Sequence, residues 1–292
     1  MKHKITKAVI PVAGFGTRFL PATKAQPKEM LPIIDKPTVQ YIVEAAAKAG
    51  IKEIVMVTSA NKRAVEDHFD RSPELEKWLA KAGKTSLLKQ VRLIPRMADF
   101  IYIRQKGGYG NGIPVLNAKN LMHNEPFIMC YGDEFFVSQP GQPNWIEQMI
   151  KVYEKYNDPV VALIQVTKEE TKRYGIFSGP QVDKNIYEIN HIEEKPGPAK
   201  AKSNLGSIGG YVLTPDIFPI LAKLKPGKGG EIWLTDAVKQ LNQKRPIYGC
   251  KIQGKLYDAG TTMGWLKANV ELSLEDPKIN KEFKKYLKGL KI

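Results

Sequence analysis

The sequence predicts an α/β protein with a mainly parallel sheet covered by helices on both faces. Up to about residue 170, short apolar runs rich in β-branched residues alternate with segments of helical character, which is the pattern of βαβ units. Beyond that point the pattern changes to shorter strands separated by turns. The 292 residues show no internal repeat and no low-complexity linker, so we expect one domain with a long carboxyl-terminal elaboration.

In the first part of the chain, strands are expected at the contiguous apolar runs, residues 7–12, 51–59, 100–105, 126–136 and 159–167. Helices are expected at residues 38–50, 61–69, 113–122 and 144–156, with a pair of short helices within 71–91. The first helix follows Pro37 and ends at Gly50, which suits its two termini. Because crossovers between parallel strands are right-handed, the loops at the carboxyl ends of the strands should share one edge.

In the second part, the apolar runs are shorter and are bounded by glycine and proline. Strands are expected at residues 174–180, 185–197, 207–214 and 246–254. Helices are expected at residues 215–224, 231–243 and from residue 261 onward.

The composition excludes several classes of protein. The net charge is +15, but the basic residues are spread along the chain and no nucleic-acid-binding motif accompanies them, so no nucleic-acid partner is expected. A positive surface instead attracts small phosphorylated substrates. No apolar run is long enough to cross a membrane, and the four histidines show no zinc-ligand spacing. Cys130 and Cys250 make no disulfide framework, which predicts a cytoplasmic location.

A long irregular segment at residues 11–32 directly follows the first strand. Its prolines prevent a regular backbone ladder, Gly14 and Gly16 permit unusual backbone angles, and its apolar residues argue against disorder. Its spacing matches neither the dinucleotide-binding G-x-G-x-x-G motif nor the P-loop. The guanidinium of Arg18 and the ammonium of Lys28 suit a triphosphate, although either residue alone is usually an ordinary surface residue.

Residues 13–37, AGFGTRFLPATKAQPKEMLPIIDKP, resemble the signature of bacterial nucleotide-sugar pyrophosphorylases, and most of all that of the UTP–glucose-1-phosphate uridylyltransferases. Residues 73–91 resemble the helical insertion that separates the uridylyl from the thymidylyl branch. Further segments follow in family order up to about residue 272: RQKGGYGNG, EPFIMCYGDE, RYGIF, EEKPGPAKAKSNLG, GYVLTPDIF, GGEIWLTDA and LYDAGTTMGW.

This resemblance implies a Rossmann-like three-layer α/β/α fold of the nucleotide-diphospho-sugar transferase type, with a mixed, mainly parallel sheet. It implies a nucleotidyltransferase domain over residues 1–272, with a nucleotide-binding part at about 1–170, a sugar-binding part at about 171–272 and a basic tail at 273–292. The implied substrates are UTP and glucose 1-phosphate, and the products are UDP-glucose and pyrophosphate. The implied assembly is a homo-oligomer, either a dimer or a tetramer.

Asp133 and Asp258 each end an apolar strand, where open α/β sheets place ligands. On position alone, an ordinary turn aspartate explains each of them. The resemblance makes them the ligands of Mg²⁺, which prefers carboxylate, phosphate and water oxygens. The family often has a second Asp at the position of Glu134, so no direct role is assigned to Glu134.

The resemblance also assigns the remaining site residues. Arg18 and Lys28 should bind the triphosphate and, with Asp133 and Lys195, form the catalytic set. Nucleotide contacts are implied for Ala13, Gly14, Gly16, Thr17, Glu29, Gln105 and Gly110. Sugar contacts are implied for Gly175, Glu194, Lys195, Gly209 and Glu231. Thr235 and Asp236 are expected only to cap or brace a helix.

One segment departs from the family pattern. The family usually reads G-L-G-H-A where this chain has Gly110, Asn111, Gly112, Ile113 and Pro114. This departure leaves open a related reaction with dTTP, or with an amino or galactosyl sugar 1-phosphate. A catalytically inactive basic binding protein is the remaining alternative, suggested only by the charge and the lysine-rich tail.

Overall fold

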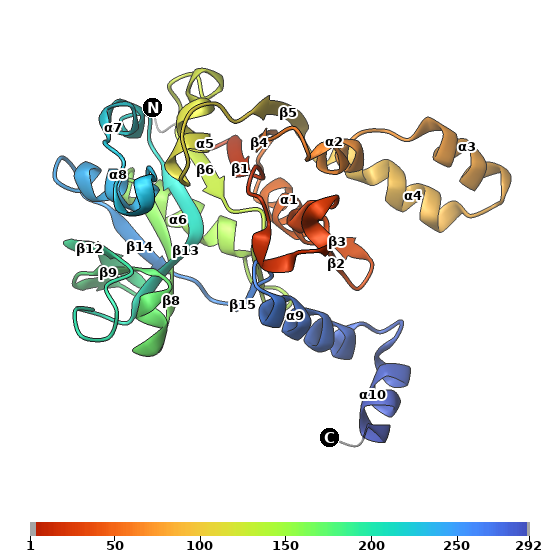
Figure 1. Cartoon of the computed structure of the whole chain (residues 1–292). Coiled ribbons are helices and arrows are strands. Elements are labelled where there is room, and N and C mark those ends of the chain that lie inside the picture. Colours follow the sequence, from red (N-terminus) through yellow and green to blue (C-terminus); the bar gives the residue numbers. More distant parts are fainter. Residues whose placement is uncertain (1–3, 291–292) are drawn as a thin grey trace.

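The computed structural model describes residues 4–290, and its core is one large twisted sheet (Figure 1). In spatial order its main strands are β5 (Asp99–Arg104), β4 (Glu53–Thr58), β1 (Lys7–Pro11), β6 (Phe127–Cys130), β13 (Leu205–Leu213), β8 (Val160–Gln165) and β14 (Tyr248–Lys251). The sheet continues through β11 (Ile186–Glu188) to β10 (Gln181–Asp183), while β9 (Gly175–Ser178) pairs with β13 and β12 (His191–Glu194) pairs with β9.

The strand directions confirm the predicted mixed, mainly parallel sheet. The pairs β1–β4, β4–β5, β1–β6 and β8–β14 are parallel. Strand β13 runs antiparallel between β6 and β8. Of the main strands described above, β13 alone therefore opposes the common direction, and it also carries the antiparallel β9–β12 pair.

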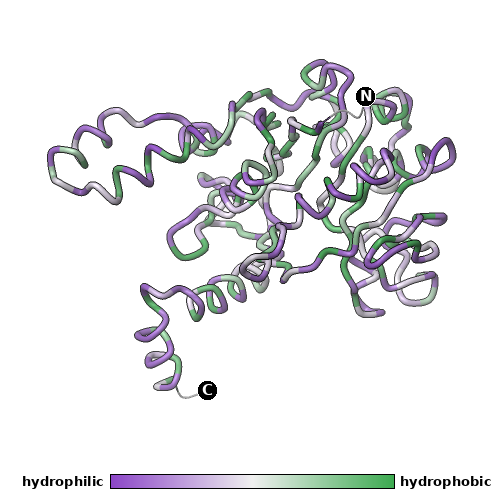
Figure 2. The backbone as a smooth tube through the Cα atoms, turned by 180° about the vertical axis from the view of Figure 1, so that it is seen from behind, coloured by the Kyte–Doolittle hydropathy of each residue, from purple (hydrophilic) through white to green (hydrophobic). Residues whose placement is uncertain are grey.

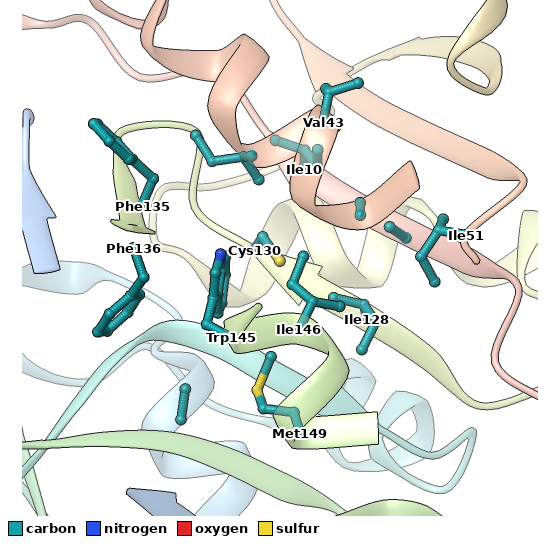
Figure 3. Packing of buried hydrophobic residues seen from close by; sticks show 14 of the residues in the cluster. Ile10, Val43, Ile51, Ile128, Cys130, Phe135, Phe136, Trp145, Ile146 and Met149 are labelled. Atoms are coloured by element: carbon teal, nitrogen blue, oxygen red, sulfur yellow. The ribbon is translucent and has the colours of Figure 1, made fainter. Parts of the chain in front are cut away.

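The two faces of the sheet are covered by separate helical layers, as the alternation of apolar runs predicts. One layer contains α1 (Thr38–Lys48) and α6 (Trp145–Tyr156), and the other contains α5 (Gly112–Asn117), α7 (Ile217–Lys223) and α8 (Leu234–Leu241). Within β1, Ile10 faces the first layer and Val9 the second, because successive side chains of a strand alternate. Figure 3 shows Ile10, Ile128, Ile146 and Trp145 in the first of these cores.

Two predicted strands are each divided in the structure. The run at 126–136 separates into β6 and β7 (Glu134–Val137), with a turn that contains Gly132 and Asp133. A Cβ atom at Gly132 would lie only 3.1 Å from atoms of Glu29 and Val12, so glycine allows this close turn. Strand β7 then leaves the main sheet and pairs with β15 (Lys255–Asp258).

The strand predicted at 185–197 is likewise divided, into β11 and β12, whereas the strand predicted at 246–254 is shortened to β14 and is followed by a separate strand, β15. The chain turns between β14 and β15 at Gly254, whose φ of 153° favours glycine. As a result, β7 and β15 form a two-stranded antiparallel sheet in which Asp258 pairs with Glu134. The single strand expected over 126–136 was therefore wrong, and the turns before β7 and β15 bring an acidic residue of each strand to the same place.

The segment at 11–32 is irregular, as predicted, but it contains short 3₁₀ turns. These are η1 (Thr17–Phe19), η2 (Ala22–Lys24) and η3 (Lys28–Met30), followed by the small hairpin of β2 (Pro32–Ile33) and β3 (Lys36–Pro37). The remaining 3₁₀ turns are η4 (Ile94–Arg96), η5 (Lys119–Leu121), η6 (Glu169–Lys172) and η7 (Lys228–Gly230).

Two helical pairs project from the sheet (Figure 1). After α2 (Arg63–Phe69), helices α3 (Pro73–Lys81) and α4 (Thr85–Leu93) form the predicted pair around Gly83. At the carboxyl end, α9 (Thr262–Glu275) and α10 (Asn280–Gly289) form an arm in which hydrophilic and apolar residues alternate (Figure 2). The predicted boundary at residue 272 lies within α9, and residues 291–292 of the predicted tail lie outside the described residues. None of the helices in residues 4–290 is long and apolar enough to cross a membrane.

Candidate active site

A cleft of about 850 Å³ opens at the carboxyl ends of β1 and β6. The strand order reverses at this point, because the chain runs from β1 outward to β4 and β5 and then crosses to β6 on the other side of β1. Open α/β sheets bind ligands at such switch points. The predicted site residues that line the cleft are Ala13, Gly14, Arg18, Lys28, Glu29, Gln105, Gly110, Asp133, Gly175, Glu194, Lys195, Gly209, Glu231 and Asp258.

Gly16 and Thr17 were predicted as nucleotide contacts but do not line the cleft. Gly16 has a φ of 68° and begins the 3₁₀ turn η1, and its carbonyl accepts a hydrogen bond from Thr23 Oγ1 at 2.7 Å. A Cβ atom at Gly16 would lie 3.2 Å from Thr23 and 3.3 Å from Lys28. In this structure Gly16 therefore shapes the loop that presents Arg18 and Lys28.

Lys28 and Asp133 form an ion pair across the cleft floor, with Lys28 Nζ 2.5 Å from Asp133 Oδ2. Burial lowers the pKa of Lys28, but the charges of Asp133 and Glu29 outweigh burial and hold the pKa above the ordinary lysine value. Lys28 is therefore a fixed cation in the cleft.

The adjacent Glu29 carboxylate is engaged elsewhere. Glu29 Oε2 lies 2.9 Å from Lys62 Nζ, and only 1% of the Glu29 side chain is exposed. Burial raises the pKa of Glu29, and the positive charge of Lys62 opposes that shift. This buried ion pair holds the loop at the residue next to Lys28, so the carboxylate of Glu29 has a structural role in the loop.

Three acidic residues meet where β6 and β15 end and β7 begins. A Cβ atom at Gly260 would collide with Asp133 Oδ2 and lie 3.2 Å from Asp258 Oδ1, so both carboxylates converge on this glycine. Burial, then the charge of Asp133, raises the pKa of Asp258. Burial, then the charges of Asp133 and Asp258, raises the pKa of Glu134 to about 8. Glu134 Oε2 accepts a hydrogen bond from Gly209 N at 2.7 Å.

This acidic site fits a magnesium ion that is completed by substrate oxygens. Mg²⁺ in nucleotide sites is typically held by one or two carboxylates together with phosphates and waters. Asp133 and Asp258 supply two converging carboxylates. Within residues 4–290, no group of three or more His, Cys, Asp or Glu side chains is arranged to hold a metal by itself.

Basic side chains surround these carboxylates. Arg173 Nη2 lies 2.9 Å from Asp258 Oδ2, and Arg18 Nη1 donates a hydrogen bond to the Gly260 carbonyl at 3.3 Å. Arg18, Lys28 and Arg173 therefore border the site on three sides, which suits a highly charged anion such as a triphosphate.

After the ligands predicted from the sequence, we call residues 107–112 the nucleotide loop and residues 231–235 the sugar wall; the two segments pack against each other. Ile232 N donates to the Tyr109 carbonyl at 2.9 Å, and Gly112 N donates to the Ile232 carbonyl at 2.9 Å. Gly110 has a φ of 114°, and any Cβ atom there would collide with the Ile232 backbone. Gln105 lies at the base of this loop, where its Nε2 donates to the Gly108 carbonyl at 3.3 Å.

Polar side chains lie close to Gly175, beside the sugar wall. A Cβ atom at Gly175 would lie 3.0 Å from Glu194 Oε2 and 3.1 Å from Ser207 Oγ. Glu194 Oε1 lies 3.2 Å from Lys195 Nζ, and that ammonium lies 4.3 Å from the centre of the Trp233 ring. The structure therefore brings Gly175, Glu194 and Lys195 together, with Trp233 supporting the lysine.

The chain matches the family described as Nucleotidyl transferase over residues 7–274. It is 46% identical over 290 residues to UTP–glucose-1-phosphate uridylyltransferase 2 of Staphylococcus saprophyticus, and the match covers 99% of each chain. The chain belongs to the UTP–glucose-1-phosphate uridylyltransferases.

Solved structures of this family have the same fold as this uridylyltransferase-family chain. A UDP-glucose pyrophosphorylase complexed with UDP-glucose superposes with a TM-score of 0.86 at 41% identity, covering 94% of this chain and 100% of that chain. A UTP-bound enzyme from Acinetobacter baumannii superposes with a TM-score of 0.91 at 36% identity, covering 99% of this chain and 100% of that chain.

Several residues that line the cleft of this family member were missed from the sequence: Tyr131, Arg173, Tyr174, Tyr211 and Trp233. The aromatic residues lie next to apolar strand or helix segments, where a pattern argument assigns them to the core. Arg173 is the first residue of the RYGIF segment, two residues before Gly175. This position in a family motif was the one indication in the sequence that Arg173 lines the cleft. Its contact with Asp258 joins residues far apart in the chain, so the sequence gives no direct indication of it.

Proposed function

We propose that this chain is a magnesium-dependent uridylyltransferase that forms UDP-glucose and pyrophosphate from UTP and glucose 1-phosphate. One observation carries the proposal: a single cleft holds Arg18 and Lys28, the Asp133–Asp258 pair, and Glu194 with Lys195. These groups suit a triphosphate, a divalent cation and a sugar phosphate. The relatives described as binding UTP and UDP-glucose add support, because the chain matches them over nearly its full length.

The proposed reaction is an in-line displacement. An oxygen of the sugar phosphate attacks the α-phosphorus of UTP, the bond from that phosphorus to the bridging oxygen breaks, and pyrophosphate leaves. The second pKa of a phosphate monoester is about 6, so the attacking oxygen is already ionised at neutral pH. The protein needs no general base, and its task is to align the two phosphates and neutralise their charge.

Each group in the cleft has a part in this alignment. Arg18 and Lys28 bind the triphosphate and stabilise the negative charge that moves onto the leaving pyrophosphate. Lys195 binds the sugar phosphate, and Glu194 accepts hydrogen bonds from the sugar hydroxyls. Gly175 allows the sugar close to the backbone, because a larger residue would fill the space between Glu194 and Ser207.

Asp133 and Asp258 would hold Mg²⁺, which supplies charge neutralisation at the triphosphate when it is bound. Lys28 contacts Asp133 and Arg173 contacts Asp258, so a cationic side chain lies beside each proposed ligand.

The base is proposed to lie between the two loops that follow β1 and β5. Ala13 and Gly14 offer backbone groups on one side, and Gln105 offers a side-chain amide on the other. Gly110 lets the second loop pack closely on the Ile232 backbone, which occupies the position that a Cβ atom would take.

A substrate matrix tests the proposal. Pyrophosphate release is measured with each nucleoside triphosphate against each sugar 1-phosphate, with and without magnesium. We expect UTP with glucose 1-phosphate to be fastest and to require magnesium. No release from any pair would contradict the proposal, and a faster reaction with dTTP or a different sugar phosphate would correct its substrates.

We also propose that the protein is a cytoplasmic homo-oligomer, a dimer or a tetramer. Exposed apolar residues on the α9–α10 arm support assembly: Met263, Leu266, Val270, Tyr286 and Leu290. The buried, unpaired Cys130 and Cys250 support a reducing compartment. Light scattering of the purified protein tests the assembly, and a mass of one chain, 32.8 kDa, would contradict it.

A further inference from the structure

Asn111 occupies the junction between the nucleotide loop and the sugar wall. Its side chain is half-buried and lines the cleft. Asn111 Oδ1 accepts a hydrogen bond from Leu234 N at 2.7 Å, which satisfies the first backbone N–H of α8. Asn111 Nδ2 donates a hydrogen bond to the hydroxyl of Tyr131 at the end of β6. One amide therefore joins three elements that are far apart in the sequence.

Tyr131 extends this connection to the sugar side of the cleft. A Cβ atom at Gly209 would collide with the Tyr131 ring, so the ring lies directly against this glycine. Tyr131 N donates to the Gly209 carbonyl at 2.7 Å, and Gly209 N donates to Glu134 at 2.7 Å. The hydrogen bond from Asn111 to the Tyr131 hydroxyl therefore holds the ring that packs against the β13 backbone at Gly209.

The second contact of Asn111 acts on the sugar wall. Leu234 follows Trp233, whose ring lies under the Lys195 ammonium. Thr235 follows Leu234 and lies close to Gly175, its Cγ2 3.3 Å from the Gly175 Cβ position. Holding the Leu234 amide therefore holds the residues on both sides of it against the proposed sugar-phosphate contacts.

We infer that Asn111 is a positioning residue for the sugar phosphate, acting through Tyr131 and the sugar wall. The inference rests on the proposed function. The family pattern has Leu at this position, and a leucine can accept no hydrogen bond from Leu234 N and donate none to Tyr131. The departure at residue 111 thus bears on the sugar phosphate, although it lies in the nucleotide loop.

The nucleotide loop itself does not depend on the Asn111 side chain. Its backbone hydrogen bonds to Ile232 run through Tyr109 and Gly112 and persist whatever residue stands at 111. Removing the amide should therefore disturb the use of the sugar phosphate more than the use of UTP. A residue that only stabilises the fold would change both equally or change neither.

The test compares Asn111→Leu with a matched control, Asn242→Leu. Asn242 is also half-buried, follows the last residue of the same helix α8, and its Nδ2 donates to the Ile189 carbonyl at 3.0 Å. It does not line the cleft. Leaving a buried hydrogen-bonding group unpaired changes an equilibrium about tenfold, so Asn111→Leu should raise KM for glucose 1-phosphate about tenfold. KM for UTP should stay within about twofold, as should both constants of Asn242→Leu.

Tyr131→Phe provides a second variant that keeps the ring in place. Tyr131→Phe should also raise KM for glucose 1-phosphate, but by less than Asn111→Leu does. The hydrogen bond from Leu234 N to Asn111 Oδ1 remains in this variant. In the double variant, the free-energy cost calculated from KM should be smaller than the sum of the two separate costs. Both substitutions remove the same hydrogen bond, the one between Asn111 and Tyr131. Melting temperatures establish that each variant is folded.

The possible outcomes separate the inference from the proposed function. A wild-type protein that releases no pyrophosphate from UTP and glucose 1-phosphate overturns both. A wild-type protein that is active, with an unchanged ratio of the two KM values in Asn111→Leu, overturns the inference alone. An equal change in Asn242→Leu would also overturn it, because the effect would then be a general loss of stability. If Asn111→Leu does not fold, an unchanged KM ratio in Tyr131→Phe overturns the inference.

Discussion

We call the part of the cleft proposed to bind the nucleotide the nucleotide side and the part proposed to bind the sugar the sugar side, and the two are built from different kinds of backbone. The nucleotide side consists of loops that follow the parallel strands β1 and β5, and two of its aromatic residues, Phe15 and Tyr109, are 73% and 66% exposed. The sugar side rests on β13, in which all nine residues are buried, and on the antiparallel β9–β12 pair. The loops present glycine backbone and the cations Arg18 and Lys28, whereas the strands hold polar side chains in fixed positions.

On the proposed function, this difference predicts that the two sides select their ligands by different means. A loop can adapt to a triphosphate, which offers charge in many directions. A sugar has hydroxyls in fixed directions, so its contacts must be held rigidly, and an unpaired buried polar group on either partner is costly. Substitutions on the sugar side should therefore act selectively, while changes at the boundary between the two sides should affect the whole reaction.

The largest expected effect lies at that boundary. Asp133→Ala should lower kcat by at least about 10³-fold, since it removes a proposed ligand of the ion that neutralises the triphosphate. The thermal stability should change little, because the loss of the ion pair with Lys28 is offset by relief of the repulsion between Asp133 and the carboxylates of Glu134 and Asp258. Pyrophosphate release and a melting curve measure both quantities. Asp183→Ala, at an exposed surface ion pair, is the control, and wild-type turnover in Asp133→Ala would remove this residue from the metal site.

Lys195→Ala should separate the two sides most clearly. A hydrogen bond to a charged group contributes about 1.5–3 kcal/mol, so KM for glucose 1-phosphate should rise about 10- to 100-fold while KM for UTP changes little. Lys28→Ala should show the reverse preference. Steady-state kinetics with each substrate varied in turn measures the effect, and Lys200→Ala, at an exposed position, serves as the control. Equal changes in both KM values would contradict the division into two sides.

Gly175→Ala should have a smaller effect confined to the sugar side. The new methyl group would lie about as close as 3.0 Å to Glu194 and 3.1 Å to Ser207, so these side chains must shift. We expect KM for glucose 1-phosphate to rise about fivefold, in line with the lower end of overpacking costs. Gly289→Ala, where no atom lies within 4 Å of the new Cβ, is the control. An unchanged KM would show that this glycine does not approach the sugar.

The last prediction concerns the pH dependence of stability and not the kinetic constants. The pKa of Glu134 is raised from 4.5 to about 8 in the folded protein, so the folded state binds a proton that the unfolded state has lost between these values. The protonated Glu134 side chain therefore contributes to the free energy of unfolding at low pH, and this contribution is lost as the pH rises from about 4.5 through 8. Glu134→Gln keeps an oxygen for Gly209 N and should gain stability over wild type at pH 8.5 more than at pH 5. Urea unfolding in EDTA measures this, with Glu282→Gln as control, and a pH-independent difference would contradict it.

The sequence predicted the fold class because the apolar runs that form β1, β4 and β8 are contiguous and local. It did not predict that the chain breaks between β6 and β7 or between β14 and β15. Gly132 and Gly254 end their strands through close approach and a positive φ, and a glycine within an apolar run gives no sign of which effect applies. The proposed site residues were chosen from motifs that occur in family order along the sequence. Most of these residues line one cleft in the structure.

What the sequence missed depends on pairing across long distances. Arg173 contacts Asp258 and Lys62 contacts Glu29, and no periodicity or spacing connects such residues. Gly16 and Thr17 were predicted from a motif to touch the nucleotide, but a motif records which residues occur together and not which of them face the ligand. Their position outside the cleft lining follows from the 3₁₀ turn η1, which the sequence pattern did not indicate.

The backbone pairing of the nucleotide loop with Ile232 has a consequence for engineering. The two segments are more than a hundred residues apart, yet they are joined through Tyr109 and Gly112 as closely as neighbouring strands. If residues 107–112 alone were replaced by the loop of a relative with another base preference, the new loop would have to form these hydrogen bonds with an unchanged Ile232 backbone. Residues 107–112 and 231–235 would have to be exchanged together, as one cassette, for a chimaera of this enzyme family to keep both of its substrates.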